Sequence, residues 1–562
     1  GSIEWCTLEA TVSTNSDDSE PAVRPEALRP ARTDFWWAIA AAIVVALAAF
    51  IRLYRLDLVP LHHDEGVNGY FLTRLFHQGF YRYDPANYHG PTLYYLALPF
   101  VLLLGMNTFA IRCVTVVFGV GIVWLVLELR REMGRTGALA AALLIAVSPG
   151  AVYFSRYFIH ETIFVFLTMG ILVAGLRYRQ TRTASSVFWA AGCIGLLVAT
   201  KETAVITLGV FLVALVATWL STRFVKPPPG RLESADQAVT DEDARTSVSD
   251  SSELADIRMP VDVGGATNSA FVESDPEAPV RRGAGAAVWA GALALIAILF
   301  VCFYSSFFTN PHGIIDGLKA LGFWARTAKS EHTHPWNAYL KWLWQMEGPL
   351  TVLAGAGGVI AIFRRDSVSF FIALWAGGAL AAYSIVPYKT PWLGLNFIPP
   401  LALLAGTTLE AFLRLSKKNM GVVAVVLGAA VALSGYRSIR LNFFEYDNDK
   451  YAYVYAHTRR EFLDMVSEIY SLAERSGQGK DCSIAVVSQD YWPLPWYLRD
   501  YTHVAYYGKA TATDAELVIA PALADQELRS IFGDDYRSIG VYTLRPGVDL
   551  ALYIRETPPA SK

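Results

Sequence analysis

His62-His63-Asp64-Glu65-Gly66 follows a long apolar segment that begins at Phe35. Two adjacent carboxylates beside a segment of membrane-spanning length are energetically costly, so Asp64 and Glu65 are candidates for a functional site. From Gly66 onward, apolar residues recur at helical spacing, which predicts a helix lying in the membrane interface with Asp64 near its start. The alternative is that Asp64 only caps this helix.

The composition predicts a polytopic α-helical membrane protein. The chain has 562 residues, 54% of them hydrophobic, and a mean hydropathy of +0.33. The apolar residues gather in blocks of membrane-spanning length, which excludes a soluble globular chain and makes membrane lipids expected partners. The net charge of -3 averages over loops in different compartments and gives no reason to expect nucleic acid. The five cysteines are scattered, so no disulfide framework or metal cluster is predicted.

Twelve apolar segments are candidate spans, and one of them is too short. The run 91–106 begins with a proline and falls short of the roughly 20 residues that cross a bilayer. If this run lies in the interface, the Arg-rich loops fall on the same side as the N-terminus, as the positive-inside rule requires. The sequence therefore predicts about 11 transmembrane helices in the plasma membrane, a cytoplasmic N-terminus and an extracellular C-terminus.

Changes in composition divide the chain into five regions. We expect a disordered cytoplasmic N-terminus (1–33), a transmembrane module (34–225) with an outer loop (57–108), an acidic disordered cytoplasmic insert (226–283), further transmembrane helices (284–439) with an outer loop (307–348), and an extracytoplasmic α/β domain (440–562). In the last region, a helix is expected over 451–475 and strands over 483–488, 503–507, 517–520, 538–544 and 549–554.

The predicted topology gathers further polar residues on the outer face. Arg156 suits a phosphate, and Glu161 could orient an acceptor or hold a cation. Lys201 and Lys389 could neutralise a phosphate, and Trp392 could stack on a sugar. The alternatives are an interfacial Arg–Glu anchor and snorkelling lysines.

His89 opens the short run before Pro91 and could bind a phosphate or a metal ion. The alternative is a hydrogen-bonded structural histidine. No spacing of potential ligands matches a standard metal site, so a divalent cation is compatible with the sequence but not required.

Three motifs carry a resemblance to a known superfamily. They are His62 to Gly66, Tyr153-Phe154-Ser155-Arg156-Tyr157-Phe158-Ile159-His160-Glu161-Thr162, and Trp492-Pro493-Leu494-Pro495-Trp496-Tyr497-Leu498-Arg499. With the interfacial Pro motif, they resemble the GT-C superfamily of polytopic glycosyltransferases, particularly its protein O-mannosyltransferase and aminoarabinose-transferase branch. More narrowly, they look like the archaeal and bacterial family of flippase-activity-associated membrane proteins.

The resemblance implies an inverting transferase with a polyprenyl (dolichyl) phosphate sugar donor, of which dolichol phosphate mannose is one form. The acceptor is a protein, glycan or lipid hydroxyl. Carried over by position, Asp64 is the general base, Glu161 is a second acidic residue of the site, and Arg156 or Lys389 holds the lipid phosphate. The full candidate site has Asp64, Glu65 and Glu161 as catalytic residues and Arg156, Lys201, Lys389 and His89 at the donor phosphate. Further candidates for substrate contacts are His63, Tyr157, His160 and Trp392. Relatives often have a Pro pair where this chain has His89-Gly90-Pro91, which leaves the role of His89 open.

Two other functions remain as alternatives. One is a flippase, or a flippase-associated transport protein, that carries a lipid-linked sugar across the bilayer. The other is an inactive scaffold of a glycosylation machinery. Transporters often contain internal repeats and interrupted helices at the membrane midplane. No clear repeat is visible in the sequence, and the polar residues gather at one interface, which favours the enzyme.

Overall fold

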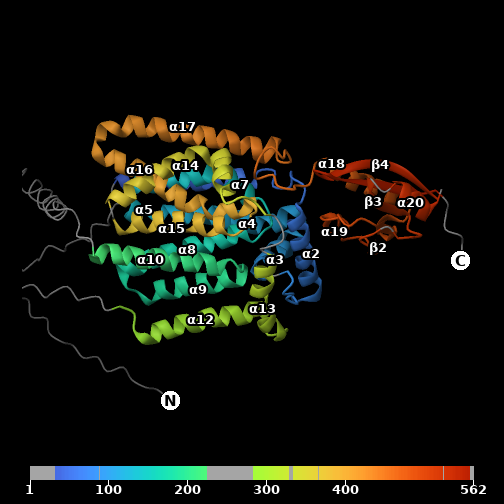
Figure 1. Cartoon of the computed structure of the whole chain (residues 1–562), viewed down its shortest axis with the longest axis horizontal. Helices are drawn as coiled ribbons and strands as arrows, with labels where there is room; N and C mark the ends of the chain where they lie inside the picture. The colour runs from blue at the N-terminus through green and yellow to red at the C-terminus, as the bar shows by residue number, and fades with distance from the viewer. Residues whose placement is uncertain are drawn as a thin grey trace, which may run out of the picture.

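The computed structural model describes residues 32–87, 89–224, 283–327, 333–364, 366–509, 511–522, 525–533 and 535–556. The predicted disordered segments 1–33 and 226–283 lie outside these ranges, except for residues 32, 33 and 283. The described residues form a bundle of apolar helices with a small sheet domain beyond one end (Figure 1).

The bundle consists of helices that are mostly of membrane-spanning length. They are α1 (Arg32–Leu53), α4 (Thr108–Leu127), α6 (Arg135–Val147), α7 (Pro149–Ser155), α8 (Glu161–Thr181), α9 (Ala184–Thr200), α10 (Ala204–Phe224), α12 (Ala286–Tyr304), α14 (Ala338–Arg364), α15 (Ser367–Ile385), α16 (Ile398–Leu415) and α17 (Met420–Ile439). Short helical turns adjoin them at α5 (Arg130–Met133), η1 (Pro391–Asn396), η2 (Lys417–Asn419) and η3 (Arg440–Phe444).

The structure confirms a multi-pass helical protein. Among the described residues, nine helices are long and apolar enough to cross a membrane, and α6 with α7, bent by 59°, makes a tenth. The eleventh predicted span corresponds to α9, an apolar helix of 17 residues that falls just short of this length. All eleven predicted segments are thus helical. The excluded run contains α3 (Thr92–Leu104), whose 13 residues are too few to cross a bilayer core.

Three shorter helices gather at the end of the bundle that faces the sheet domain (Figure 1). They are α2 (His63–Gln78), α3 and α13 (His312–Thr327). Helix α2 covers the helix predicted from Gly66 onward and ends at Gly79, whose φ of 76° suits glycine at a left-handed C-cap. This arrangement places the start of α2 between the bundle and the sheet domain.

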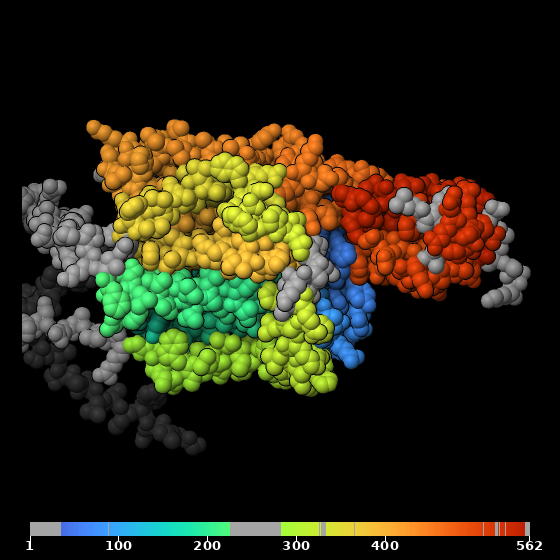
Figure 2. All heavy atoms as spheres, viewed as in Figure 1, coloured from blue at the N-terminus to red at the C-terminus, as the bar shows by residue number. Residues whose placement is uncertain are grey.

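The C-terminal α/β domain is confirmed. Its helices are α18 (Glu461–Arg475), η4 (Gly479–Asp481), α19 (Leu494–Tyr497) and α20 (Asp525–Phe532), and its strands are β1 (Ile484–Val486), β2 (Val504–Tyr506), β3 (Leu517–Pro521), β4 (Tyr536–Arg545) and β5 (Val548–Arg555). The sheet order is β2-β1-β3-β5-β4, with β1 parallel to β2 and β3, and β5 antiparallel to β3 and β4. Every predicted strand is present, whereas the predicted helix begins ten residues later than expected. The domain projects from the bundle as a separate lobe (Figure 2).

The segment Trp492 to Arg499 fastens this domain to the bundle. The Leu61 N–H donates to the Tyr497 hydroxyl (3.0 Å), and Trp496 Nε1 donates to Thr108 Oγ1 (3.3 Å). Arg499 Nη2 donates to the Met106 carbonyl (2.7 Å) and stacks on the Trp496 ring. The conspicuous Trp-Pro-Leu-Pro-Trp motif therefore holds the sheet domain against the first loop of the bundle.

Candidate functional site

The start of α2 is capped by His62, not by Asp64. The His62 Nδ1 accepts from the Asp64 N–H (3.1 Å), and Glu65 Oε2 accepts from the His62 N–H (3.0 Å), which completes a capping box. His62 Nε2 lies 3.1 Å from the Tyr455 carbonyl. Because the other ring nitrogen accepts, Nε2 must carry the proton. The Asp64 carboxylate is therefore not needed as a cap, and its side chain is 40% exposed.

Glu65, unlike the adjacent and partly exposed Asp64, lies in the protein interior. Its carboxylate is fully buried and accepts from Arg112 Nε (2.8 Å) and Nη2 (2.7 Å) and from the Phe158 N–H (2.7 Å). Arg112 also donates to the carbonyls of Leu56, Val59 and Pro60. The sequence suggested a catalytic role for Glu65, but the structure gives it the contacts of a residue that ties the first loop to α4.

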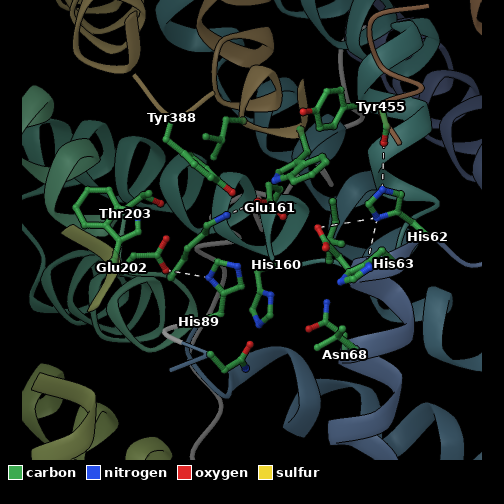
Figure 3. A pocket seen from close by; sticks show the side chains of 18 of the residues that line it. His62, His63, Asn68, His89, His160, Glu161, Glu202, Thr203, Tyr388 and Tyr455 are labelled. Carbon is green, nitrogen blue, oxygen red and sulfur yellow. Dashed lines mark hydrogen bonds and ion pairs between the residues drawn. The ribbon is translucent and has the colours of Figure 1, made fainter. Parts of the chain in front are cut away.

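A cavity of about 480 Å³ opens beside the first turn of α2. Its volume falls within the range of small-molecule sites. Its ionisable lining comprises Asp64, Glu161, Glu202, Lys201, Arg545, His62, His63, His89 and His160. Its amide and aromatic lining comprises Asn68, Asn87, Trp324, Tyr383, Tyr388, Trp392 and Tyr455. His62 and His63 lie across the cavity from His89 and Glu202 (Figure 3).

The wall opposite Asp64 contains a lysine–glutamate ion pair and a histidine–glutamate hydrogen bond. Lys201, which follows α9, pairs through Nζ with Glu161, the first residue of α8. His89 Nδ1 lies 3.0 Å from Glu202 Oε2. The backbone fixes this wall as well, because the Gly90 N–H donates to the Thr200 carbonyl (3.1 Å). A Cβ at Gly90 would lie 1.9 Å from the Ala199 carbonyl oxygen, so the chain can pass this close only with glycine.

The charge states of these groups follow from burial and from their neighbours. Burial disfavours the Lys201 ammonium, but the carboxylates of Glu161 and Glu202 outweigh it and raise the pKa of Lys201. Burial opposes ionisation of Glu202, yet His89 and Lys201 bring the pKa of Glu202 below its usual value. Burial, with His89 and Lys201 nearby, holds the pKa of His160 well below its usual value, so His160 is neutral at pH 7. The wall thus holds a permanent ammonium flanked by carboxylates.

The structure brings seven of the eleven predicted site residues to the cavity: Asp64, His63, His89, His160, Glu161, Lys201 and Trp392. The other four, among them Glu65, do not line it. Tyr157 is buried between rings, with its hydroxyl 3.2 Å from that of Tyr153. Lys389 Nζ donates to the carbonyls of Val386 (2.5 Å) and His334 (3.3 Å).

Arg156 also lies outside the cavity lining, although the sequence suggested a phosphate contact. Its Nη1 donates to the carbonyls of Ile51, Arg52 and Tyr54, and its Nη2 donates to that of Arg55. Its guanidinium also stacks on the Phe443 ring. Arg156 therefore satisfies the carbonyls that α1 leaves unpaired at its C-terminal end.

Sequence reasoning missed several cavity residues. Asn68 lies one turn beyond Asp64, donates to the Phe158 carbonyl (2.9 Å) and accepts from the Tyr94 hydroxyl (3.1 Å). Its spacing from Asp64 on one helix face was the available signal. Tyr455 and Arg545 come from the C-terminal region, and no local pattern distinguishes them. Among the described residues, no group of three or more His, Cys, Asp or Glu is placed to hold a metal ion, and the divalent cation stays a prediction.

Comparisons with known proteins agree with this fold. Residues 88–228 match the family model described as dolichyl-phosphate-mannose-protein mannosyltransferase. No curated protein matches the sequence. The structure resembles ArnT from Cupriavidus metallidurans, solved in the apo state and bound to undecaprenyl phosphate. Both matches have a TM-score of 0.57 and cover 92% of this chain and 98% of that one, at 13% and 14% identity.

A second neighbour is the Archaeoglobus fulgidus oligosaccharyltransferase tethered with an acceptor peptide containing the NVT sequon. It has a TM-score of 0.52 and 13% identity, over 91% of this chain and 74% of that one. Such identities show a shared fold, which here extends over nearly the whole chain, and the family model adds a match in sequence across α3 to α10. The chain therefore has the fold of the GT-C glycosyltransferases, and its residues 88–228 match the mannosyltransferase family model in sequence.

Proposed function

We propose that this protein transfers a sugar from a polyprenyl phosphate donor to an acceptor hydroxyl, with Asp64 as the general base. The observation that carries the proposal is the meeting of Asp64 with Lys201, Glu161 and His89 in one cavity. A carboxylate on one wall and an ammonium on the other provide the two groups that an inverting transfer needs.

The position of Asp64 suits a base. His62 fixes the backbone at Asp64, and no described Arg or Lys lies within 4 Å of the Asp64 carboxylate. In the proposed step, Asp64 takes the proton of the acceptor hydroxyl as that oxygen bonds to the anomeric carbon of the donor. The bond from this carbon to the phosphate oxygen breaks on the opposite face, polyprenyl phosphate leaves, and the configuration inverts.

Lys201 and His89 are the proposed contacts of the donor phosphate. Support comes from their place on the wall opposite Asp64 and from the permanent charge of Lys201. The ArnT structure bound to undecaprenyl phosphate supports a polyprenyl phosphate ligand for a protein of this fold. The description of the matched family model favours a mannosyl donor. Glu161, paired with Lys201, would orient the ammonium toward the phosphate.

We also propose that the cavity faces the outside of the cell. Helices α8, α10 and α16 begin beside the cavity, so their basic residues Arg179, Arg223 and Arg414 lie near their far ends. The positive-inside rule puts such ends in the cytoplasm. The sheet domain and the C-terminus would then be extracellular, and the acceptor would enter from the aqueous side.

The test uses the purified full-length protein and a polyprenyl-phosphate-linked mannose. In detergent, we expect release of polyprenyl phosphate that increases when an acceptor is added. In liposomes, a flippase would instead carry the intact lipid-linked sugar across the bilayer without releasing polyprenyl phosphate. A scaffold would do neither. Transbilayer movement without release would therefore contradict the proposal and support the transport alternative.

A further inference from the structure

Arg545 brings the sheet domain into the wall of the cavity. It is the last residue of β4, and it pairs in register with Val548 across the turn that contains Gly547 (φ 82°). Its side chain is 17% exposed and pairs with Asp490, which lies in the loop after β1. The end of β4 and the loop after β1 thus together hold one guanidinium at the cavity.

Arg545 belongs to the Asp64 side of the cavity. Both Arg545 and Asp490 act electrostatically on His63, the residue before Asp64, whose pKa is lowered mainly by burial. Lys201 instead faces Glu161 and Glu202 on the opposite wall. The cavity therefore has two polar ends, one of which is completed by the sheet domain.

The chemistry of the Arg545–Asp490 pair differs from that of the Lys201 wall. A guanidinium carries five N–H donors, and the ion pair to Asp490 occupies the Nη2 group only. The Asp490 carboxylate is half exposed and retains acceptor capacity. Because the two charges cancel, the pair presents donors and acceptors side by side without a net charge. Such a pair matches neighbouring sugar hydroxyls better than it matches a phosphate.

We propose that Arg545, held by Asp490, binds hydroxyl groups of a carbohydrate acceptor next to Asp64. This inference rests on the proposed function and names the acceptor class: a glycan or the sugar headgroup of a glycolipid. The aromatic rings of Trp392 and Tyr455 in the same lining provide faces on which a sugar ring can stack. The docking segment Trp492 to Arg499 keeps the sheet domain, and with it Arg545, at the cavity.

The test measures binding and needs no turnover. Full-length protein in detergent is titrated with methyl glycosides of mannose, glucose and galactose and with one disaccharide, followed by saturation-transfer NMR. Undecaprenyl phosphate is titrated separately. The variants are Arg545→Gln and Arg545→Lys. The matched control is Arg537→Gln, because Arg537 lies on the same strand, pairs with Glu556 and does not line the cavity.

We expect the wild type and Arg537→Gln to bind at least one glycoside equally well. Arg545→Gln should weaken that binding by about tenfold, and Arg545→Lys should weaken it less, since it retains the charge but not the planar fork. Affinity for undecaprenyl phosphate should stay unchanged in all variants. Unchanged sugar binding in Arg545→Gln, a loss of undecaprenyl phosphate binding in that variant, or no glycoside binding by the wild type would each overturn the inference. Failure of the proposed transfer would appear separately, as absence of polyprenyl phosphate release.

Discussion

The Glu65 carboxylate and the Arg112 guanidinium are joined by two hydrogen bonds of 2.8 and 2.7 Å in a fully buried site. Asp64, the adjacent residue, has a half-exposed side chain at the cavity. The two adjacent carboxylates thus have different roles. Glu65 holds the first loop against α4, and Asp64 faces the cavity.

This division predicts opposite phenotypes for the two carboxylates. Glu65→Gln leaves the Arg112 charge buried and uncompensated, which should lower the free energy of unfolding by about 3 kcal/mol or more. Asp64→Asn should change stability by less than about 0.5 kcal/mol, since it lies at a solvated cavity. Thermal unfolding in detergent compares the two variants. Equal stability losses would contradict the assignment of Glu65 as the structural member of the pair.

The interface between α2 and the docking segment predicts a second result. A Cβ at Gly69 would lie 2.6 Å from the Trp496 ring, so Gly69→Ala forces the ring or the helix to move. Overpacking of this kind costs about 1–3 kcal/mol. We expect the linker between η3 and α18 to become more sensitive to limited proteolysis. Gly175→Ala in α8 is the control, because nothing lies within 4 Å of its added Cβ; equal sensitivity of both variants would count against this docking contact.

Acid should destabilise the protein through His457. Burial, with His62 nearby, holds the pKa of His457 well below its ordinary value of 6.5. Below about pH 6.5 the unfolded chain binds a proton that the folded chain does not, so stability falls as the pH falls, by up to about 1.4 kcal/mol per pH unit. Thermal unfolding at several pH values should show a shallower loss in His457→Gln. The exposed His77→Gln serves as control, and identical slopes in all three proteins would contradict the prediction.

Lys201 should determine the affinity for the lipid phosphate. The double variant Lys201→Met/Glu161→Gln removes the ammonium without leaving its buried partner charged, and its affinity for undecaprenyl phosphate should fall by about tenfold, or about 1.4 kcal/mol. Glu161→Gln alone retains the ammonium and should bind within about threefold of the wild type. Equal affinities of the double variant and the wild type, measured by ligand titration in detergent, would remove Lys201 from the donor site.

The fold could be predicted closely because its signals are local. Apolar runs of membrane-spanning length predicted the helices of the bundle, and the short run that begins with a proline was correctly excluded as a span. Alternation of apolar and polar residues predicted every strand of the sheet. The predicted helix 451–475 began ten residues too early, because the residues before α18 form turns and bends in the structure.

The site could be predicted only in part, because each cavity residue depends on where its side chain points. Arg156 and Lys389 have the charge that a phosphate contact needs and were expected on the same side of the membrane as Asp64. Both side chains instead donate hydrogen bonds to backbone carbonyls, and the sequence does not reveal these partners. Arg545 lies more than 450 positions after Asp64 and reaches the cavity only through the docked sheet domain. Glu65 could not be separated from Asp64 without the position of Arg112.

The most direct test of the central claim is the rate of polyprenyl phosphate release by Asp64→Asn. Purified wild type and variant are given the same polyprenyl-phosphate-linked sugar and acceptor, after titration with undecaprenyl phosphate has shown equal binding. If Asp64 is the general base, the rate of release should fall by about 100-fold or more in Asp64→Asn. Asp490→Asn serves as the comparison variant: it should still release polyprenyl phosphate, with its rate reduced only through weaker acceptor binding. Full turnover by Asp64→Asn would contradict the account.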